Sequence, residues 1–385
     1  MPLTNPPLSL YIHTPWCVRK CPYCDFNSHE RSGALPEAAY LAALLADLEQ
    51  EMPDVQQREI TSIFFGGGTP SLLSPDFYDR LLRTLSQRLT LAPDCEITLE
   101  ANPGTVEQDR FNGFRQAGIN RLSIGVQSFD EGHLRALGRI HGGAEALRAA
   151  EQARRAGFEN LNLDLMHALP GQSSDQALAD LRQAIALAPT HISWYELTIE
   201  PNTAFFRAPP TQPDGDSMAD TEAVGFALLA AAGYGRYEVS AFARPDQRCR
   251  HNLNYWAFGD YLALGAGGHG KVTRDTSHGR QLLRYRKTRM PADYLAEGGT
   301  ARRGATIVSA DELPGEFMMN ALRLVNGVET TTFTARTGLP LSTLAAPLSR
   351  ARQQGLMVDT PDHLACTPLG LAHLNHTVGL FMPAH

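Results

Sequence analysis

Three cysteines within eight positions are the residues of this sequence best suited to chemistry. Cys17, Cys21 and Cys24 follow a CxxxCxxC pattern, and Phe26 stands where a fourth thiol would extend it. Zinc usually takes four ligands in paired CxxC knuckles, so three thiolates on one loop do not suit a structural zinc site. A [4Fe-4S] cluster normally takes four thiolates, and three leave one iron open to a small molecule. The pattern therefore predicts an iron–sulfur cluster with one open corner.

The composition indicates a reducing compartment for these thiols. Six cysteines in 385 residues are too few for a disulfide scaffold, so we expect Cys95, Cys249 and Cys366 to be isolated thiols. A net charge of −7 argues against nucleic acid, which is bound through clustered Lys and Arg. The N-terminus lacks a basic and apolar leader, and no run approaches the roughly 18 apolar residues of a membrane span. We expect a soluble, cytoplasmic protein.

The elements that must position the cysteines alternate between short β-rich runs and helical periodicity over the first 200 residues, which indicates βαβ units. The predicted strands are residues 8–13, 60–65, 96–100, 121–126, 161–165 and 191–197. The predicted helices are residues 36–52, 75–89, 106–117, 143–156 and 174–186. Gly118 and Gly157 follow two of these helices, where a left-handed residue often ends a helix. A parallel sheet with right-handed crossovers follows, either an open doubly wound layer or a curved partial barrel.

Polar residues recur where the predicted strands end. The stretch GGGTP, residues 66–70, follows the second strand, and its glycines would let the backbone approach a ligand. Glu100 follows the third strand, Gln127 the fourth, and Asp164 lies at the end of the fifth. Each could be a capping or surface residue by itself. Because active sites of barrels lie at this rim, together with the cysteine loop they predict one concave site.

The rest of the chain begins with a turn-rich linker at residues 209–215. The elements expected after it are a helix at 216–232, a strand at 237–243, helices at 316–326 and 341–354, a hairpin at 355–367 and a last helix. Helix, helix and hairpin make a winged-helix pattern, which often binds DNA. Residues 305–385 contain four Arg, no Lys and six Asp or Glu, so we expect a lid or a partner surface instead.

CxxxCxxC in the loop after the first strand resembles the radical S-adenosylmethionine superfamily, in which the open iron binds the amino and carboxylate groups of that nucleotide. Six stretches resemble, more specifically, the oxygen-independent coproporphyrinogen III oxidases and their relatives: LYIHTPWCVRKCPYCDF, FFGGGTPSLL, LEANPGT, RLSIGVQSF, LGRIHG and NLDLMHALPGQ. The resemblance implies a partial parallel (β/α)6 barrel of radical-SAM type followed by a smaller C-terminal winged-helix-like α+β domain. The expected divisions are a barrel in residues 1–235, a connecting region in 236–304 and the C-terminal domain in 305–385.

The resemblance also implies roles for individual residues. Cys17, Cys21 and Cys24 would hold the cluster. The residues that would line the first S-adenosylmethionine site are Tyr11, Tyr23, Gly67, Gly68, Thr69 and Glu100. The residues that mark where the oxidases contact a second such molecule are Gln127, Arg139 and Asp164.

Two departures separate this sequence from the oxidases. Their motif continues CxxxCxxCxC, whereas Phe26 stands at the last position here. They also carry a long segment ahead of the cluster, whereas 16 residues precede Cys17. In addition, Arg250–Trp256 (RHNLNYW) matches the HNxxYW signature of the haem chaperones within this family. That resemblance implies haem binding and delivery to apo-haemoproteins of the respiratory chain, membrane-bound ones included.

The signature has a physical basis as a haem site. Imidazole is a strong axial ligand of haem iron, and a helical spacing of four would place Tyr255 on the same face as His251. Trp256 could stack on the porphyrin plane. The alternative for His251 is a structural histidine held by hydrogen bonds. His269, in the glycine-rich stretch at 264–270, is a weaker candidate.

Three functions remain open at this stage. The first is a haem chaperone that carries the cluster and S-adenosylmethionine, with haem bound at His251. The second is an enzyme that decarboxylates coproporphyrinogen III through a 5′-deoxyadenosyl radical. The third, compatible with the first, uses the acidic C-terminal domain as a docking surface for client proteins. A homodimer is compatible with all three.

Overall fold

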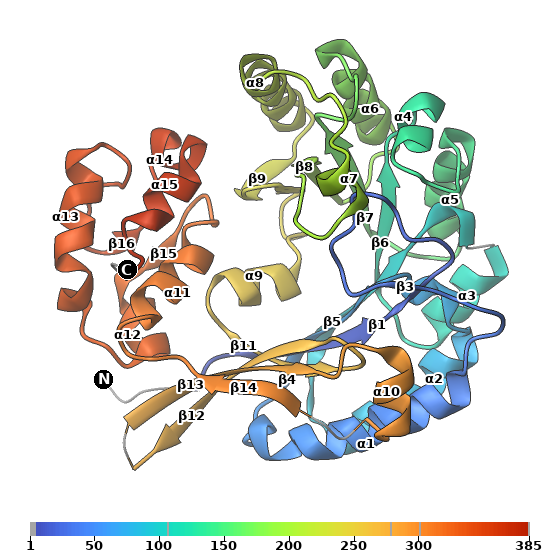
Figure 1. Cartoon of the computed structure of the whole chain (residues 1–385), viewed down its shortest axis with the longest axis horizontal. Coiled ribbons are helices and arrows are strands. Elements are labelled where there is room, and N and C mark those ends of the chain that lie inside the picture. The colour runs from blue at the N-terminus through green and yellow to red at the C-terminus, as the bar shows by residue number, and fades with distance from the viewer. Residues whose placement is uncertain (1–4, 106–107, 278, 300–301, 384–385) are drawn as a thin grey trace.

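The computed structural model describes residues 5–105, 108–277, 279–299 and 302–383. Its centre is a sheet of twelve strands in the order β14-β13-β12-β11-β1-β4-β5-β6-β7-β8-β10-β9. Six consecutive members are parallel and curve around a concave face, with helices covering the outside (Figure 1). These six strands are β1 (Leu8–Thr14), β4 (Ile60–Gly67), β5 (Leu91–Ala101), β6 (Arg121–Gln127), β7 (Asn160–His167) and β8 (His191–Glu196). The predicted partial (β/α)6 barrel is confirmed.

The outer layer is formed by helices that follow the strands in turn. They are α1 (Glu37–Val55), α2 (Pro75–Arg88), α3 (Gln108–Gln116), α4 (Glu131–Ala136), α5 (Gly143–Arg155), α6 (Ser174–Ala186) and α8 (Gly215–Ala231). The short helix α7 (Ala204–Arg207) instead contacts the loop after β1, where the N–H of Phe205 donates to the Pro22 carbonyl at 3.0 Å. Gly118 and Gly157 have φ of +110° and +84°, which confirms the left-handed helix ends. The predicted start of the third helix, at residues 106–107, lies outside the described residues.

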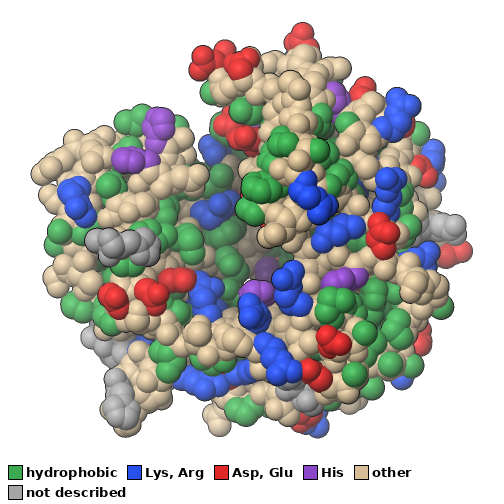
Figure 2. Space-filling model, viewed as in Figure 1, with side chains coloured by type: hydrophobic (Ala, Val, Ile, Leu, Met, Phe, Trp, Pro, Cys, Tyr) green, Lys and Arg blue, Asp and Glu red, His purple; other side chains and the backbone are tan. Residues whose placement is uncertain are grey.

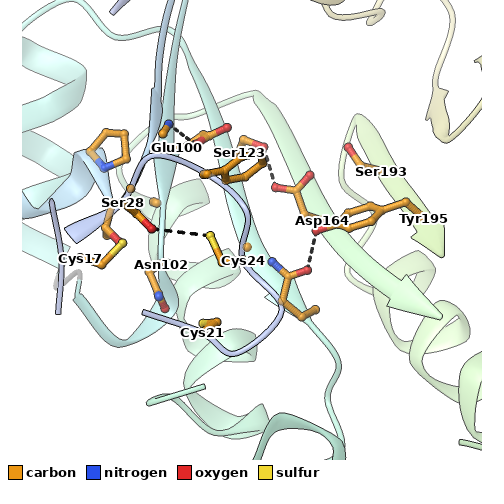
Figure 3. Close-up of a pocket in the computed structure, with 18 of the residues that line it drawn as sticks. Cys17, Cys21, Cys24, Ser28, Glu100, Asn102, Ser123, Asp164, Ser193 and Tyr195 are labelled. Atoms are coloured by element: carbon orange, nitrogen blue, oxygen red, sulfur yellow. Dashed lines mark hydrogen bonds between the residues drawn. The ribbon is translucent and has the colours of Figure 1, made fainter. Parts of the chain in front are cut away.

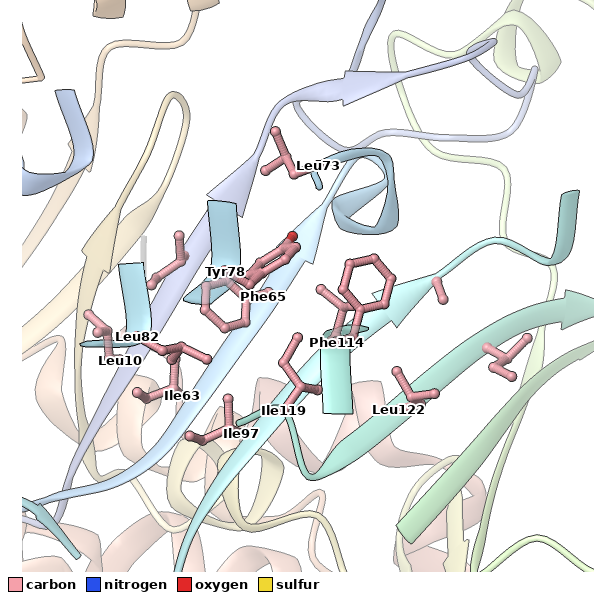
Figure 4. Packing of buried hydrophobic residues seen from close by; sticks show 14 of the residues in the cluster. Leu10, Ile63, Phe65, Leu73, Tyr78, Leu82, Ile97, Phe114, Ile119 and Leu122 are labelled. Carbon is pink, nitrogen blue, oxygen red and sulfur yellow. The ribbon is translucent and has the colours of Figure 1, made fainter. Parts of the chain in front are cut away.

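Alternation along each strand decides which side chains face the helices and which face the concave side. Apolar side chains from successive strands pack against the helices, as Leu10, Ile63, Phe65, Ile97 and Leu122 do beside Tyr78, Leu82 and Phe114 (Figure 4). The alternate positions carry polar side chains, which therefore line the concave face. In β5, β6 and β7 these are Thr98, Glu100, Arg121, Ser123, Asn162 and Asp164.

The sheet extends beyond the barrel at both edges. At one edge β11 (Asp260–Leu264) runs parallel to β1, and three antiparallel strands follow, namely β12 (His269–Thr276), β13 (Gly279–Lys287) and β14 (Arg302–Ile307). These four strands were not predicted. At the other edge the single strand predicted at 237–243 is wrong, because a turn divides it into β9 (Gly235–Glu238) and β10 (Ala241–Ala243). The short helices α9 (Arg250–Trp256) and α10 (Pro291–Ala296) also belong to this connecting part.

The C-terminal residues form a smaller α+β unit at one side of the sheet (Figure 1). Its elements are α11 (Leu313–Ala321), α12 (Thr330–Thr337), α13 (Ala345–Gln353), α14 (Pro368–Ala372), α15 (Leu374–Gly379), β15 (Val328–Glu329) and β16 (His363–Leu364). Phe317, Phe333 and Leu344 belong to its own apolar cluster, joined by Phe258 and Leu282 from the connecting part.

The predicted hairpin at 355–367 forms one bridge, between Met357 and Cys366, while β16 pairs with β15. The predicted helix at 316–326 ends at Ala321, and α12 was not predicted. None of the described helices is both long and apolar enough to cross a membrane.

A buried ionic network fastens the added strands to the barrel. Lys287 of β13 forms ion pairs with Asp47 and Glu51 of α1, and all three side chains are fully buried. Arg302 of β14 donates to Glu51 at 2.6 Å and 2.8 Å, and Tyr285 donates to the same carboxylate. The network therefore determines where β13 lies relative to α1.

We expect Lys287→Met to lower the free energy of unfolding by about 3–5 kcal/mol, because buried Asp47 loses its cation and buried Glu51 keeps only Arg302. The matched control is Arg88→Met, which breaks the exposed ion pair with Glu49 of the same helix α1. That change should cost less than about 1 kcal/mol. Urea unfolding followed by circular dichroism measures both values, and equal losses would contradict the assignment.

Candidate metal and ligand site

The cysteine loop connects β1 to α1 at the carboxyl end of the barrel. A two-residue parallel ladder between β2 (Trp16–Cys17) and β3 (His29–Glu30) brackets it. Lys20 Nζ donates to the carbonyl oxygens of Phe26 at 3.0 Å and Ser28 at 3.2 Å, which holds the loop in a closed turn. All three cysteines line one cavity of about 350 Å³ (Figure 3).

Each of the three sulfur atoms has a polar neighbour. Thr69 Oγ1 donates to Cys17 Sγ at 3.4 Å, and Arg139 Nη1 donates to Cys21 Sγ at 3.9 Å. Cys24 Sγ and Ser28 Oγ are hydrogen-bonded at 3.6 Å. Hydrogen bonds to ligand sulfurs tune the reduction potential of iron–sulfur clusters and orient the ligands. Burial raises the pKa of the Cys17 and Cys24 thiols, so in the free chain these donors are needed to stabilise thiolates.

The donor set fits an iron–sulfur cluster. Within the described residues, no three His, Cys, Asp or Glu side chains are placed to hold a single metal ion. The thiolates of a cubane cluster bind three different irons at separate corners, so they stand farther apart than the ligands of one ion. Three thiolates around one cavity therefore suit a cluster with an open corner better than a tetrahedral zinc ion.

Two glycines at the carboxyl end of β4, Gly67 within the strand and Gly68 after it, form the wall next to the cysteines. Gly67 has φ of +109°, and a Cβ there would lie 2.5 Å from the ring of His13. A Cβ on Gly68 would lie 2.5 Å from the carbonyl oxygen of Trp16. The backbone N–H groups of Gly68 and Thr69 donate to Thr14 and Trp16, both at 2.7 Å, so this turn is fastened to the start of the cysteine loop. Larger residues at either glycine would separate the two loops.

The polar residues predicted at the strand ends, Glu100, Gln127 and Asp164, line the same cavity. Tyr23 and Arg139, which the family resemblance implied, line it as well. Glu100 accepts a hydrogen bond from the N–H of Gly67 at 3.2 Å. Burial, and after it the charge of Asp164, raises the pKa of Glu100 to about 8, and burial raises the pKa of Asp164. Two desolvated carboxyl groups on one wall favour a ligand that carries positive charge or hydrogen-bond donors.

A second cavity, of about 600 Å³, lies on the other side of α9. Helix α9 packs on the concave face over β1, β4 and β11 (Figure 1). His251 and Tyr255 line the second cavity, whereas Asn252 and Trp256 line the first. Phe26 lines both cavities. The helix and Phe26 thus form a wall shared by two ligand-sized spaces.

His251 and Tyr255 share a face of α9, as their spacing predicted. The ring of His251 stacks on Phe64, with centroids 4.9 Å apart, and Tyr255 stacks on Tyr261 at 4.9 Å. The Nδ1 atom of His251 is buried and has no hydrogen-bond partner in the described part of the chain. Burial, and then the charge of Arg121, lowers the pKa of His251 to about 4, so its imidazole is neutral at pH 7. The structural alternative predicted hydrogen bonds to His251, and its Nδ1 atom makes none within the described residues, so the neutral imidazole is compatible with a ligand.

Two aromatic residues are placed differently from the other expected ligand contacts. Tyr11, expected at the first nucleotide site, lines the second cavity and lies 6.1 Å from the ring of His251. Burial, and after it the charge of Glu100, raises the pKa of Tyr11. Trp256, expected beside the ligand of His251, lines the first cavity, and Arg323 lies 4.4 Å from its ring centroid.

Several lining residues were missed by sequence reasoning. Alternation within β6 could have indicated Ser123, which donates to Asp164 at 2.8 Å. Tyr195, at the end of β8, donates to Gln127 at 2.8 Å and also lines the first cavity. Arg323 comes from the C-terminal unit, and no local pattern marks it.

Comparisons with known proteins agree with this geometry. Residues 11–184 match the model of the radical SAM superfamily, and residues 308–373 match that of the HemN C-terminal domain. The protein named heme chaperone HemW of Escherichia coli (strain K12) is 51% identical over 98% of each chain. The heme chaperone HemW of Haemophilus influenzae is 48% identical, again over 98% of each chain. The chain belongs to the HemW family.

A solved structure shows the same fold. Coproporphyrinogen III oxidase (HemN) from Escherichia coli has a TM-score of 0.82, covers 98% of this chain and 90% of its own, and is 22% identical. Together with the match of residues 11–184 to the radical SAM model, this likeness confirms the radical-SAM type of partial barrel. Membership of the superfamily implies a [4Fe-4S] cluster and S-adenosylmethionine for the HemW-family chain.

Helix α9 is held at its N-terminus by a buried carboxylate that sequence reasoning also missed. Glu96 Oε1 accepts the N–H groups of Arg250 at 3.0 Å and His251 at 3.4 Å, and the Cys249 thiol at 3.5 Å. Its Oε2 lies 3.9 Å from Nε of the buried Arg121. A carboxylate at a helix N-terminus is stabilising, and this one also fixes the backbone of His251.

For the cluster, we expect Cys17→Ala, Cys21→Ala and Cys24→Ala each to reduce iron and sulfide well below the about four of each per chain of a complete cluster. The matched control is Cys366→Ala, which removes a buried thiol far along the chain. Iron and sulfide assays on anaerobically reconstituted protein measure the difference. Full retention of iron in any of the three variants would contradict the assignment.

For α9, we expect Glu96→Gln to lower the free energy of unfolding by about 2–4 kcal/mol, since the helix N-terminus and buried Arg121 lose a negative charge. Asp94→Asn is the control, because Asp94 pairs with the exposed side chain of Arg250 at the same helix start. The control should leave stability nearly unchanged. Urea unfolding compares the two variants, and no loss in Glu96→Gln would refute the role of Glu96.

Proposed function

We propose that this chain is a haem chaperone: it binds haem at His251 and passes it to apo-haemoproteins of the respiratory chain, with a [4Fe-4S] cluster and S-adenosylmethionine bound in the neighbouring cavity. One observation carries the proposal. A neutral imidazole with an unpartnered buried nitrogen lines a cavity of about 600 Å³, in a chain 51% identical to a protein named as a heme chaperone.

The second cavity suits a flat, largely apolar ligand. Tyr11, Phe26, Tyr255 and Tyr261 supply aromatic surface, and the volume lies in the range of sites for small molecules and cofactors. His251 is the proposed axial ligand, because its low pKa keeps the nitrogen lone pair free at neutral pH. Tyr255, one helical turn away, is proposed to contact the same haem. Haem is the cargo in this scheme.

The first cavity is the proposed site of the other two cofactors. Cys17, Cys21 and Cys24 would hold the cluster, which when bound supplies an open iron and an electron. The residues proposed to line the S-adenosylmethionine site are Tyr11, Tyr23, Gly67, Gly68, Thr69 and Glu100. Gln127, Arg139 and Asp164 extend the same wall and would contact a second molecule. Arg139 also donates to the Gly125 carbonyl at 2.7 Å, so its guanidinium is positioned before any ligand binds.

The organisation of the chain fits delivery to a partner. We propose a barrel at 1–235, a connecting region with the haem motif at 236–304 and a client-facing domain at 305–385. The C-terminal unit contributes Arg323 to the first cavity, so a client bound there would contact the wall next to the cofactors. A cytoplasmic location and a homodimer complete the proposal.

We expect His251→Ala to weaken haem binding at least about tenfold, which corresponds to about 1.4 kcal/mol, because the iron loses its axial nitrogen. The measurement is titration of the anaerobically reconstituted chain with haem, followed at the Soret band. Transfer to a respiratory apo-haemoprotein is then followed by the spectrum of the acceptor. His269→Ala is the matched control, since it removes another imidazole that lines the same cavity.

Two outcomes would change the proposal. If His251→Ala leaves haem affinity and haem transfer unchanged, His251 is not the ligand of the haem iron. Formation of protoporphyrinogen IX from coproporphyrinogen III under anaerobic reducing conditions would replace the chaperone with the oxidase. The oxidase alternative is tested because the cysteines, the glycines and Glu100, which the family resemblance implies for binding the cluster and S-adenosylmethionine, all line the first cavity.

A further inference from the structure

The second cavity has a basic edge. Arg286 of β13 and Arg289 just after it are exposed side chains that line the cavity, beside His269 of β12. No ion pair or hydrogen bond engages either guanidinium within the described ranges of the chain. Figure 2 shows Lys and Arg side chains and histidines gathered around a hollow on this face.

The neighbouring arginines differ in this respect. Arg284 of the same strand pairs with Glu316, Arg302 pairs with Glu51, and Arg303 pairs with Glu297. Each of these three therefore has a structural partner in the fold. Arg286 and Arg289 are the arginines of this region whose charge faces the cavity without such a partner among the described residues.

The backbone near Arg286 and Arg289 is held by contacts with α1 and with the cysteine loop. Lys287 lies between them in sequence, and its burial with Asp47 and Glu51 directs the neighbouring residue Arg286 to the opposite face of β13. The carbonyl oxygen of Arg289 accepts a hydrogen bond from Asn27 Nδ2 at 2.8 Å. That bond ties Arg289 to the cysteine loop, one residue after Phe26. The backbone that carries each guanidinium is thus held, next to Arg286 by buried Lys287 and at Arg289 by the hydrogen bond from Asn27.

The charge balance of the cavity favours an anion. Asp25 is the carboxylate among its lining residues. Burial lowers the pKa of His13 and of His251 to about 4, so neither is charged at pH 7. Burial, followed by the charges of Arg286 and Arg289, lowers the pKa of His269 as well. The charged groups that line the cavity at pH 7 are therefore two guanidinium groups and one carboxylate, which leaves a net positive charge.

We propose that Arg286 and Arg289 bind the two propionate carboxylates of the haem whose iron lies at His251, an inference that rests on the proposed function. A porphyrin of this kind is apolar over most of its faces and carries its carboxylates along one edge. The cavity has the matching arrangement, with aromatic walls and a basic edge. The planar guanidinium donates two parallel hydrogen bonds to a carboxylate, which gives orientation as well as affinity. The pair would thereby fix which edge of the porphyrin faces solvent.

The test separates recognition of carboxylates from ligation of iron. The variant Arg286→Ala/Arg289→Ala is made in the full, anaerobically reconstituted chain and titrated with three probes. The probes are ferric haem, metal-free protoporphyrin IX, which keeps the propionates, and haem dimethyl ester, which lacks the free carboxylates. The control Arg303→Ala removes the same charge from the strand paired with Arg286 but from a residue outside the cavity.

We expect the double variant to bind haem and protoporphyrin IX about tenfold or more weakly and to bind the dimethyl ester as the wild-type chain does. Arg303→Ala should bind all three probes normally. His251→Ala should lose affinity for the two iron-containing probes and keep its affinity for protoporphyrin IX. Arg286→Lys/Arg289→Lys, which keeps the charge, should recover part of the lost affinity.

The results that would contradict carboxylate binding by the arginines differ from those that would contradict iron ligation by His251. Unchanged affinity of the double variant for haem and protoporphyrin IX would overturn the role of the arginines while leaving His251 in place. An equal loss for all three probes would show that the arginines support the cavity and do not recognise carboxylates. Haem binding insensitive to His251→Ala would overturn the proposed iron ligand alone. A wild-type chain that binds none of the probes would overturn both.

Discussion

The position of β1 between two parallel neighbours is the constraint on which both cavities depend. Strand β4 pairs with it on one side and β11 on the other, so the loop that leaves its carboxyl end emerges where the barrel meets the added strands. The cysteines of that loop reach the barrel cavity, and Phe26, two residues after Cys24, borders both cavities. Close packing at this point is strict, because a Cβ on Gly265 would lie 2.3 Å from the carbonyl oxygen of His13. One strand end therefore sets the distance between the two proposed ligand sites.

Buried charges then fix the pieces that surround this strand. Lys287 with its two carboxylates holds the outer face of β13 against α1, while Glu96 holds the start of α9 on the concave face. Desolvating charged groups is costly, and an apolar replacement of similar shape is often at least as stable. These buried charges contribute orientation, because each carboxylate accepts hydrogen bonds from specific donors and so fixes the position of the element that carries them. Both groups act on segments that carry the proposed haem contacts, His251 on α9 and Arg286 on β13.

The sequence predicted the barrel far better than the additions to it. Strands with alternating apolar residues and helices with regular periodicity were found within a few residues, as α6 was, and the cysteine loop with its strand-end partners was placed at one cavity. Strands β11–β14 were missed because a glycine-rich stretch and an arginine-rich run lack a recognisable period, and α1 supplies their anchoring carboxylates from far away in sequence. Arg286 resembles Arg284 and Arg303 when read along the chain. Only the folded arrangement separates this guanidinium, which has no partner among the described residues, from those that have one.

Helix α9 joins the two halves of the site because consecutive residues on it face different cavities. His251 and Tyr255 lie four positions apart on one face, and Asn252 and Trp256 lie four positions apart on the other. A seven-residue helix whose N-terminus is bound by Glu96 cannot turn one face without moving the other. Trp256, on the face turned to the first cavity, has Arg323 of the C-terminal unit 4.4 Å from its ring centroid. The same helix thus contributes residues to the proposed haem site and to the first cavity, and through Trp256 it contacts the part of the chain proposed to meet a client.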